Sequence, residues 1–378
     1  MPPEVASLST MIVNSPLPNG STPLLCVQAR SISNQKPTNR SLSLRLFPFL
    51  QRRRQKLNAV VLPPSPPAAY PPRELEHLTP STMTADERIA MGTRCRDADP
   101  VPKVPGAGGV EVGPDGQRIQ VMHNGIRVLA DGYYGAWMTR LIELCRGHHE
   151  AQEERVFHEV VSRLPEGGTM IELGGFWALY SIWFLRSAPG RRAVLVEPDP
   201  AHIAIGEANL ALNGVSAEFV HGFVGEEPGS CRAFSTEESG VVEIPCFDVA
   251  SLMARYCMDR LTILHCDAQG AEFKVLEQAA PLMRAGKIDW VFVSTHHHSI
   301  SGDPLTHQRC LTLLRSLGGQ IEAEHSVQES FSGDGLICAR FCPAPAGWTP
   351  IHLSYNRASQ SLFRDPLYDL AQQQPPKL

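Results

Sequence analysis

Residues 170–184, MIELGGFWALYSIWF, are the stretch that decides the fold. The apolar run MIEL has the length and composition of a buried strand, and Gly174 and Gly175 mark a turn directly after it. The apolar and aromatic residues that follow predict a helix. Strand, glycine turn and helix in this order are typical of folds that hold nucleotide-type cofactors, because the free amides at the helix N-terminus face the ligand.

Strand–helix alternation continues after this unit. Apolar runs that predict strands alternate with amphipathic runs that predict helices: AVLVE, AHIAIGEANLALN, AEFVHGFV, LTILHC, GAEFKVLEQAAPLM, IDWVFVS and LTHQRCLTLLRSLG. QIEAEHSV and GLICARF predict a terminal strand pair, and residues 225–260 predict an inserted hairpin and short helix. The pattern predicts an α/β, doubly wound, Rossmann-like fold with a mostly parallel sheet and helices on both of its faces.

Composition divides the chain into four segments. We expect a disordered Pro/Ser/Arg-rich extension at 1–82, an irregular, partly β lead-in with a helix at 83–147, the alternating domain at 148–345 and a tail at 346–378. The extension holds 14 of the 32 prolines, and a targeting segment or an upstream start before Met83 are its alternatives.

The lead-in carries its own signals. The Asn124-Gly125 pair predicts a β-hairpin turn. Tyr133, Tyr134 and Trp137 make this segment a candidate substrate lid.

Charge is distributed unevenly. Residues 1–83 hold nine Lys/Arg against three Asp/Glu, whereas the remainder holds 25 against 36. Phosphate binding needs clustered Lys/Arg, so the acidic main body argues against nucleic acid and for a neutral or cationic substrate group.

The sequence also bears on location. No apolar run reaches the length of a membrane span. The ten cysteines include no CxxC pair, and no signal-peptide pattern opens the chain. We therefore expect reduced thiols and a cytoplasmic protein without a membrane span; the sequence predicts no oligomeric state.

Glu197 is the second cofactor feature. LVEP places Glu197 and Pro198 at the end of the next strand, 23 residues beyond Gly174. A carboxylate there can accept both hydrogen bonds of a ribose 2′,3′-diol, which both NAD and S-adenosylmethionine carry. Phe176 and Trp177 stand where a dinucleotide needs glycine, so S-adenosylmethionine is favoured. Glu172 suits the positively charged amino group of its tail.

Five segments together resemble the FkbM-type S-adenosylmethionine-dependent methyltransferases: IELGGFWALYSIWF, VLVEPDP, ANLALNG, LHCDAQGAEFKVLEQ and FSGDGLICAR. The resemblance covers about residues 148–342. It implies a class I methyltransferase sheet with an antiparallel last strand, and O-methylation of a hydroxyl on a sugar or small-molecule acceptor.

The chain departs from the family's pattern at several positions. Glu172 replaces the usual Asp, Gly175-Phe176 replaces Ala-Asn, Ala178 replaces the last glycine, and Gln269 replaces the commoner Glu. These departures affect the expected contacts of the cofactor's tail.

Two strand ends carry the predicted chemistry. HCDAQGAE places Asp267 beside the glycine turn, as general base, metal ligand or partner of the cofactor's methionine moiety. In STHHHSISGD, which follows the next strand, we expect His296 or His297 to contact the substrate or act as base. A divalent metal held by Asp267 and a loop histidine stays open, because no diagnostic ligand spacing is present.

The predicted site therefore has two parts. Asp267, His296 and His297 are the candidate catalytic residues. The candidate cofactor-binding residues are Glu172, Gly174, Gly175, Phe176, Trp177, Glu197, Pro198, Asp267 and Gln269. Three secondary candidates are His149 or Glu153 at the cofactor mouth and Asp334 as an acceptor contact. The alternatives are a Rossmann-type NAD-dependent oxidoreductase and a non-catalytic cofactor-binding scaffold.

Overall fold

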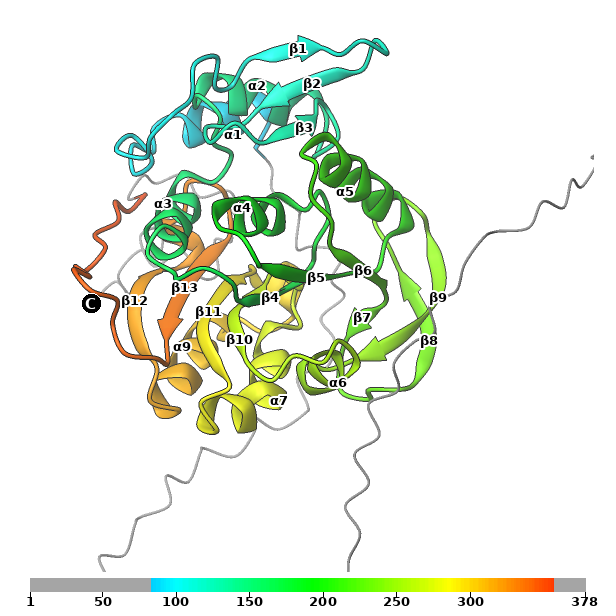
Figure 1. Cartoon of the computed structure of the whole chain (residues 1–378), viewed down its shortest axis with the longest axis vertical. Helices are drawn as coiled ribbons and strands as arrows, with labels where there is room; N and C mark the ends of the chain where they lie inside the picture. Colours follow the sequence, from blue (N-terminus) through cyan, green and yellow to red (C-terminus); the bar gives the residue numbers. More distant parts are fainter. Residues whose placement is uncertain (1–82, 357–378) are drawn as a thin grey trace, which may run out of the picture. The chain divides into compact units, whose positions relative to one another are not determined.

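A seven-stranded sheet forms the centre of the computed structural model, which describes residues 83–356 (Figure 1). The expected extension at 1–82 and residues 357–378 of the expected tail lie outside the described residues. The strand order is β12 (Gln320–His325), β13 (Gly335–Arg340), β11 (Ile288–Thr295), β10 (Leu261–Cys266), β4 (Thr169–Leu173), β5 (Arg192–Glu197) and β6 (Glu218–His221). Only β13 runs antiparallel to its neighbours β11 and β12, so the predicted class I sheet with an antiparallel last strand is confirmed.

Helices cover both faces of this sheet (Figure 1). One face carries α3 (Ala151–Val161), α4 (Leu179–Ser187) and α5 (Pro200–Leu212), and the other carries α6 (Val249–Arg255), α7 (Glu272–Arg284) and α9 (Thr306–Ser316). Side chains of β4 alternate between the two apolar layers: Met170 belongs to the layer with α3 and α4, and Ile171 to the layer with α6 and α7. Burial on both faces explains why MIEL is almost continuously apolar.

The lead-in forms a small antiparallel sheet with two helices. Its strands are β1 (Val110–Val112), β2 (Arg118–Val121) and β3 (Arg127–Leu129), and its helices are α1 (Ala85–Gly92) and α2 (Ala136–Leu144). The chain between β2 and β3 makes the predicted turn at Asn124-Gly125. Met122 and Ile126 lie in the same apolar cluster as Phe157 of α3, so the lead-in packs against the α3 and α4 face.

A third sheet interrupts the alternation, as predicted for residues 225–260. It consists of β7 (Phe223–Val224), β9 (Val241–Phe247) and β8 (Cys231–Ser235), in that order. The single strand predicted for AEFVHGFV is wrong, because the chain divides at Gly222 into β6 and β7, which belong to different sheets. A Cβ at Gly222 would lie 2.8 Å from the carbonyl oxygen of Pro245, so the chain bends tightly against β9 here.

Asn209 of α5 joins the lead-in to the glycine turn. Its buried side chain accepts a hydrogen bond from the Leu129 amide of β3 at 2.8 Å and donates to the Trp177 carbonyl at 2.9 Å. Asn213, one helical turn later, accepts from the Arg127 amide at 2.9 Å. The two asparagines of ANLALN therefore connect α5 to β3 and to the turn after β4. Among residues 83–356, no helix is both long and apolar enough to cross a membrane.

Candidate active site

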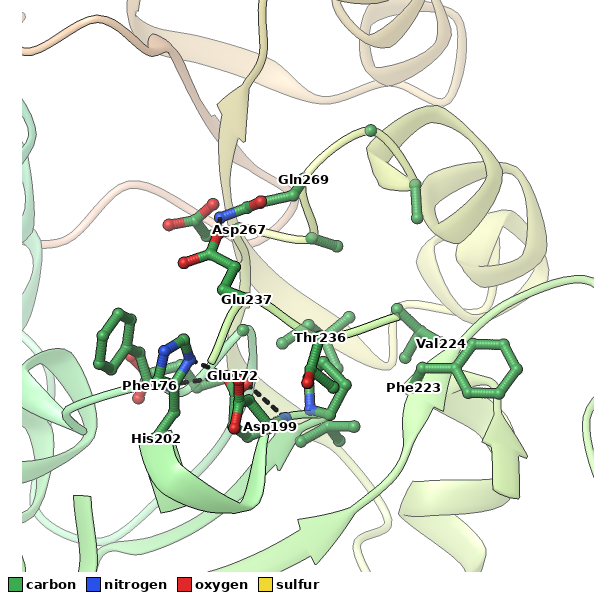
Figure 2. Close-up of a pocket in the computed structure, with 18 of the residues that line it drawn as sticks. Glu172, Phe176, Asp199, His202, Phe223, Val224, Thr236, Glu237, Asp267 and Gln269 are labelled. Carbon is green, nitrogen blue, oxygen red and sulfur yellow. Dashed lines mark hydrogen bonds and ion pairs between the residues drawn. The ribbon is translucent and has the colours of Figure 1, made fainter. Parts of the chain in front are cut away.

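A cavity of about 600 Å³ lies at the carboxyl ends of β4, β5 and β10. Connections from β4 and β10 lead to opposite edges of the sheet, and such a switch point is where ligands bind in doubly wound folds. The predicted cofactor residues that line the cavity are Glu172, Gly174, Phe176, Trp177, Glu197, Pro198, Asp267 and Gln269. Figure 2 shows Glu172, Phe176, Asp199 and His202 on one wall, with Glu237, Asp267 and Gln269 on another.

The two glycines serve the packing of strand ends. Gly174 has φ +84°, and a Cβ there would lie 1.9 Å from the carbonyl oxygen of Asp267. A Cβ at Gly175 would lie 2.8 Å from the Cβ of Leu195 in β5. Gly175 is not among the residues that line the cavity. Both positions therefore exclude a side chain because of neighbouring strands, whereas we expected them to leave room for a ligand.

In the turn after the two glycines, two residues that are neither glycine nor asparagine have a positive φ. Phe176 has φ +25° and Ala178 has φ +64°, at two of the positions where the chain departs from the family's pattern. Left-handed backbone costs an L-residue about 1–2 kcal/mol. Hydrogen bonds hold it here: the Phe176 amide donates to Glu197 Oε2 at 3.0 Å, and Asn209 binds the Trp177 carbonyl.

Glu197 is buried and fixed at the end of β5. Its Oε1 accepts a hydrogen bond from the Asp199 amide at 2.9 Å and lies 3.4 Å from His202 Nδ1. Its Oε2 accepts from the Phe176 amide. Each carboxylate oxygen has two lone pairs, so the group can accept further hydrogen bonds from the cavity side.

Glu172 is buried where β4 meets the first turn of α4. Its Oε2 accepts hydrogen bonds from the Ser181 amide, at 3.0 Å, and from the Ser181 hydroxyl. Burial raises the pKa of Glu172 to about 7, although His265 and Ser181 act in the opposite direction. The group therefore changes its ionisation near neutral pH.

His296 lies among three carboxylates at the end of β11. Its Nδ1 is 2.6 Å from Glu272 Oε1, and its Nε2 is 3.2 Å from Asp267 Oδ1 and 3.7 Å from Asp334 Oδ1. Burial by itself would lower the pKa of His296, but the three carboxylates raise it well above its usual value. His296 is therefore an imidazolium at neutral pH.

Asp334 joins this cluster from the loop before β13. Burial raises its pKa to about 7; the His296 cation opposes this rise and Asp267 adds to it. The side chains of Asp267 and Asp334 remain 35% and 30% exposed, respectively, so both can be reached from solvent. The sequence marks Asp334-Gly335 mainly as a turn, and only the pairing of β13 with β11 brings Asp334 to the site.

His297 points elsewhere. Neither His296 nor His297 is among the residues that line the cavity; within the His296 cluster, Asp267 lines it and Asp334 does not. His297 Nδ1 accepts a hydrogen bond from the Ser299 amide at 3.2 Å, at the start of α8 (His298–Ser301). Neighbouring side chains at a strand end diverge, so only one of the two histidines meets Asp267.

The β8–β9 loop supplies residues that sequence reasoning missed. Asp199 Oδ2 accepts hydrogen bonds from the Glu238 and Ser239 amides at 2.7 and 3.2 Å. Glu237, the neighbouring residue, accepts a hydrogen bond from Gln269 Nε2 at 2.9 Å (Figure 2). The loop thus spans the cavity from β5 to the β10–α7 connection, a contact for which the sequence carries no local signal.

Aromatic rings form the wall toward the lead-in. Tyr133 stacks on Trp177, with centroids 4.3 Å apart and planes 7° apart. Phe176 stacks on His202, with centroids 3.5 Å apart and planes 9° apart. Tyr133 and Tyr134 both line the cavity, so the lead-in contributes directly to its surface.

One family model matches part of the chain. Residues 166–321 match the family model described as the Methyltransferase FkbM domain. This FkbM domain contains the glycine turn, Glu197 and Asp267, so the resemblance seen in the motifs is confirmed over that range. A methyltransferase domain implies S-adenosylmethionine as its cofactor. No curated protein sequence matches the chain.

Several solved structures that are similar to the chain carry the name of a methyltransferase or methylase. Precorrin-6y C5,15-methyltransferase from Geobacter metallireducens GS-15 is 14% identical over 50% of this chain and 87% of its own, with a TM-score of 0.32. Ribosomal protein L11 methylase from Lactobacillus delbrueckii subsp. bulgaricus is 12% identical over 52% and 81%, with a TM-score of 0.33. A putative tRNA methyltransferase from Streptococcus pneumoniae is 12% identical over 48% and 67%, with a TM-score of 0.31.

These titles contradict the predicted partners, a small-molecule or carbohydrate acceptor and no nucleic acid. They name a ribosomal protein and a tRNA beside a precorrin. The prediction rested on net charge and on the family's usual acceptors. Net charge does not select an acceptor, because recognition depends on the charge around the cavity mouth.

We predict that Gly174→Ala destabilises the protein by about 3 kcal/mol or more, because left-handed strain and a collision with the Asp267 carbonyl combine. Gly214→Ala is the matched control: Gly214 has φ +63° and open space around its Cβ position, so only about 1–2 kcal/mol of strain is expected. Urea unfolding followed by circular dichroism measures both values. Equal losses in the two variants would show that the approach of Asp267 is unimportant.

Proposed function

We propose that the cavity binds S-adenosylmethionine and that the protein transfers its methyl group to a hydroxyl. The observation that carries this proposal is the position of the cavity, which lies at the strand ends of the FkbM domain with Glu197 buried beside it. Glu197 binds the ribose diol. Phe176 and Pro198 form apolar surface beside the adenosine, and Glu172 with Gln269 holds the methionine end.

The acidic character of the cavity fits this ligand. Glu172, Glu197 and Asp267 all line it. S-adenosylmethionine carries a sulfonium and an ammonium, and opposite charges stabilise each other most where water is excluded. A dinucleotide would bring a negatively charged pyrophosphate to the same walls, which makes the NAD alternative unfavourable.

The cluster at His296 supports a hydroxyl as the acceptor. A hydroxyl is a weak nucleophile and must lose its proton as the new bond forms. In the proposed step the acceptor oxygen attacks the methyl carbon, the carbon–sulfur bond breaks to leave the neutral thioether, and the proton passes to Asp334. Asp267 orients the hydroxyl. His296, already protonated, positions both carboxylates and is itself held by Glu272.

The first test is calorimetric titration of the full chain with S-adenosylmethionine, S-adenosylhomocysteine and NAD. We expect micromolar binding of the two sulfur compounds, weakened about tenfold or more in Glu197→Gln because a charge-assisted hydrogen bond is lost. Glu218→Gln, which removes an exposed carboxylate on the neighbouring strand β6, should bind like wild type. Binding of NAD alone would contradict the proposal, and binding of none of the three would favour the scaffold alternative.

A pH titration tests the role of Glu172. Its pKa of about 7 means that its carboxylate ionises as pH rises from 5.5 to 7, so the affinity for S-adenosylmethionine should increase about tenfold over this range. Glu172→Gln should remove the increase. 5′-Methylthioadenosine lacks the amino-acid tail and should bind wild type equally at both pH values. A pH dependence shared by that compound would exclude Glu172 as the partner of the tail.

The proposed base makes a second pH prediction. Asp334 must be ionised to accept the proton, so transfer from labelled S-adenosylmethionine to an acceptor in a cell extract should rise with pH through about 7 and level off above it. Asp334→Asn should reduce the rate about 100-fold and abolish this rise. The exposed Asp259, before β10, gives the control variant Asp259→Asn. An unchanged profile in Asp334→Asn would remove Asp334 from the mechanism.

A further inference from the structure

A second cluster of polar side chains lies where the lead-in meets α3, outside the cofactor cavity. His123 follows β2, His148 precedes α3, and Glu154 belongs to α3. All three are at most 1% exposed. One nitrogen from each histidine and one carboxylate oxygen lie within 4.8 Å of one another.

Both carboxylate oxygens of Glu154 have protein partners. Its Oε1 accepts hydrogen bonds from the His149 amide at 2.8 Å, from His149 Nδ1 at 2.7 Å and from the Glu150 amide at 3.2 Å. Its Oε2 faces His148 Nδ1 at 2.6 Å and His123 Nδ1 at 3.3 Å.

Several nitrogens of the cluster lack protein partners. Within residues 83–356, neither ring nitrogen of His123 makes a hydrogen bond, and His148 Nε2 makes none either. Buried polar atoms without partners are rare because each forfeits its hydration.

We propose that His123, His148 and Glu154 Oε2 bind a divalent transition metal of the Zn²⁺ type. Imidazole nitrogen and carboxylate oxygen are ligands that Zn²⁺ prefers, in a four-coordinate arrangement. Solvent supplies the fourth ligand from an adjoining cavity of about 490 Å³, which His123 lines together with Asn124 and His158. The Oε1 hydrogen bonds hold the carboxylate in place, as outer-shell partners do in metal sites.

Binding requires one local movement. The His123 and His148 rings stack with centroids 4.1 Å apart and planes 16° apart. A metal ion lies near the plane of each imidazole that binds it, so the His123 ring must turn out of this stack. The turn moves His123 Nδ1 away from Glu154 Oε2, which lies 3.3 Å from it, and the metal ion takes the place of this contact. The ion shares Oε2 with His148 Nδ1, which lies 2.6 Å from that oxygen. The metal would then join the β2–β3 hairpin to α3 and stabilise the docking of the lead-in.

The test uses the full chain without a histidine tag, stripped with EDTA and titrated with Zn²⁺ against a chromophoric chelator. We expect each chain to bind one Zn²⁺ ion tightly. The thermal unfolding midpoint should rise by about 5 °C when free Zn²⁺ is 100-fold above its dissociation constant. His123→Asn should weaken this binding by more than the about 10–100-fold that loss of an outer-shell partner causes. Without metal, this variant should unfold at a lower temperature than wild type, because it loses the ring contacts with His148 and Trp183; the readout is therefore the Zn²⁺-dependent shift measured against the metal-free form of the same variant.

A matched control distinguishes the cluster from other histidines. His325 is buried but lies in β12, so His325→Asn should bind Zn²⁺ like wild type and keep the thermal shift. Mg²⁺, which prefers oxygen ligands, should produce no shift in any variant. Absence of a tight equivalent in the stripped protein would overturn the proposal. An equivalent that persists in His123→Asn, or that His325→Asn removes, would overturn it as well.

Discussion

The carbonyl oxygen of Asp267 fills the space that a side chain at Gly174 would need, and the site depends on this close approach. The Asp267 amide donates to the Leu173 carbonyl at 2.8 Å, so β10 stays paired with β4 one residue beyond its end. On the other side, the Gly174 amide donates to the Val196 carbonyl of β5 at 2.9 Å. The ends of β4, β5 and β10 therefore meet around Gly174, which has no side chain to keep them apart. This hydrogen-bonded backbone lies beside the cavity, which Asp267 and Glu197 also line.

The charge states of the carboxyl groups in and beside the cavity affect which ligands it can bind. Glu172 lines the cavity, and Asp334 lies 3.7 Å from His296 in the adjoining cluster. Both have pKa values near 7 because burial disfavours their charged forms. A cationic ligand would stabilise the ionised form of each, so its arrival releases protons. The same pKa shifts determine how the stability of the folded protein changes with pH. Protonated Glu172 and Asp334 stabilise the folded protein at acid pH, and this contribution is lost as pH rises through about 7.

The sequence predicts the sheet well because burial on both faces leaves a strong local signal in runs such as MIEL and LTILHC. It also places Asp267 and Glu197 correctly at strand ends, since those ends meet at one edge of a parallel sheet. Contacts between distant segments leave no such signal. Asp199, for example, accepts a hydrogen bond from the amide of Glu238 in the β8–β9 loop, 39 residues along the chain. Alternation predicts that His296 and His297 diverge, but only the fold shows that His296 is the one facing Asp267.

In the turn after Gly175, tertiary contacts stabilise a backbone conformation that the residues there do not prefer. Asparagine and glycine adopt left-handed backbone easily, whereas Phe176 and Ala178 adopt it here against their preference. Glu197 binds the Phe176 amide, and the His202 ring stacks against the Phe176 ring, so neighbours over-determine the strained conformation. Strain retained in this way is typical of functional sites. The bulky residue places a flat aromatic face on the cavity wall beside Glu197, where the family's asparagine would present a polar group. In this chain, the cavity wall beside Glu197 is therefore more apolar than the family's pattern implies.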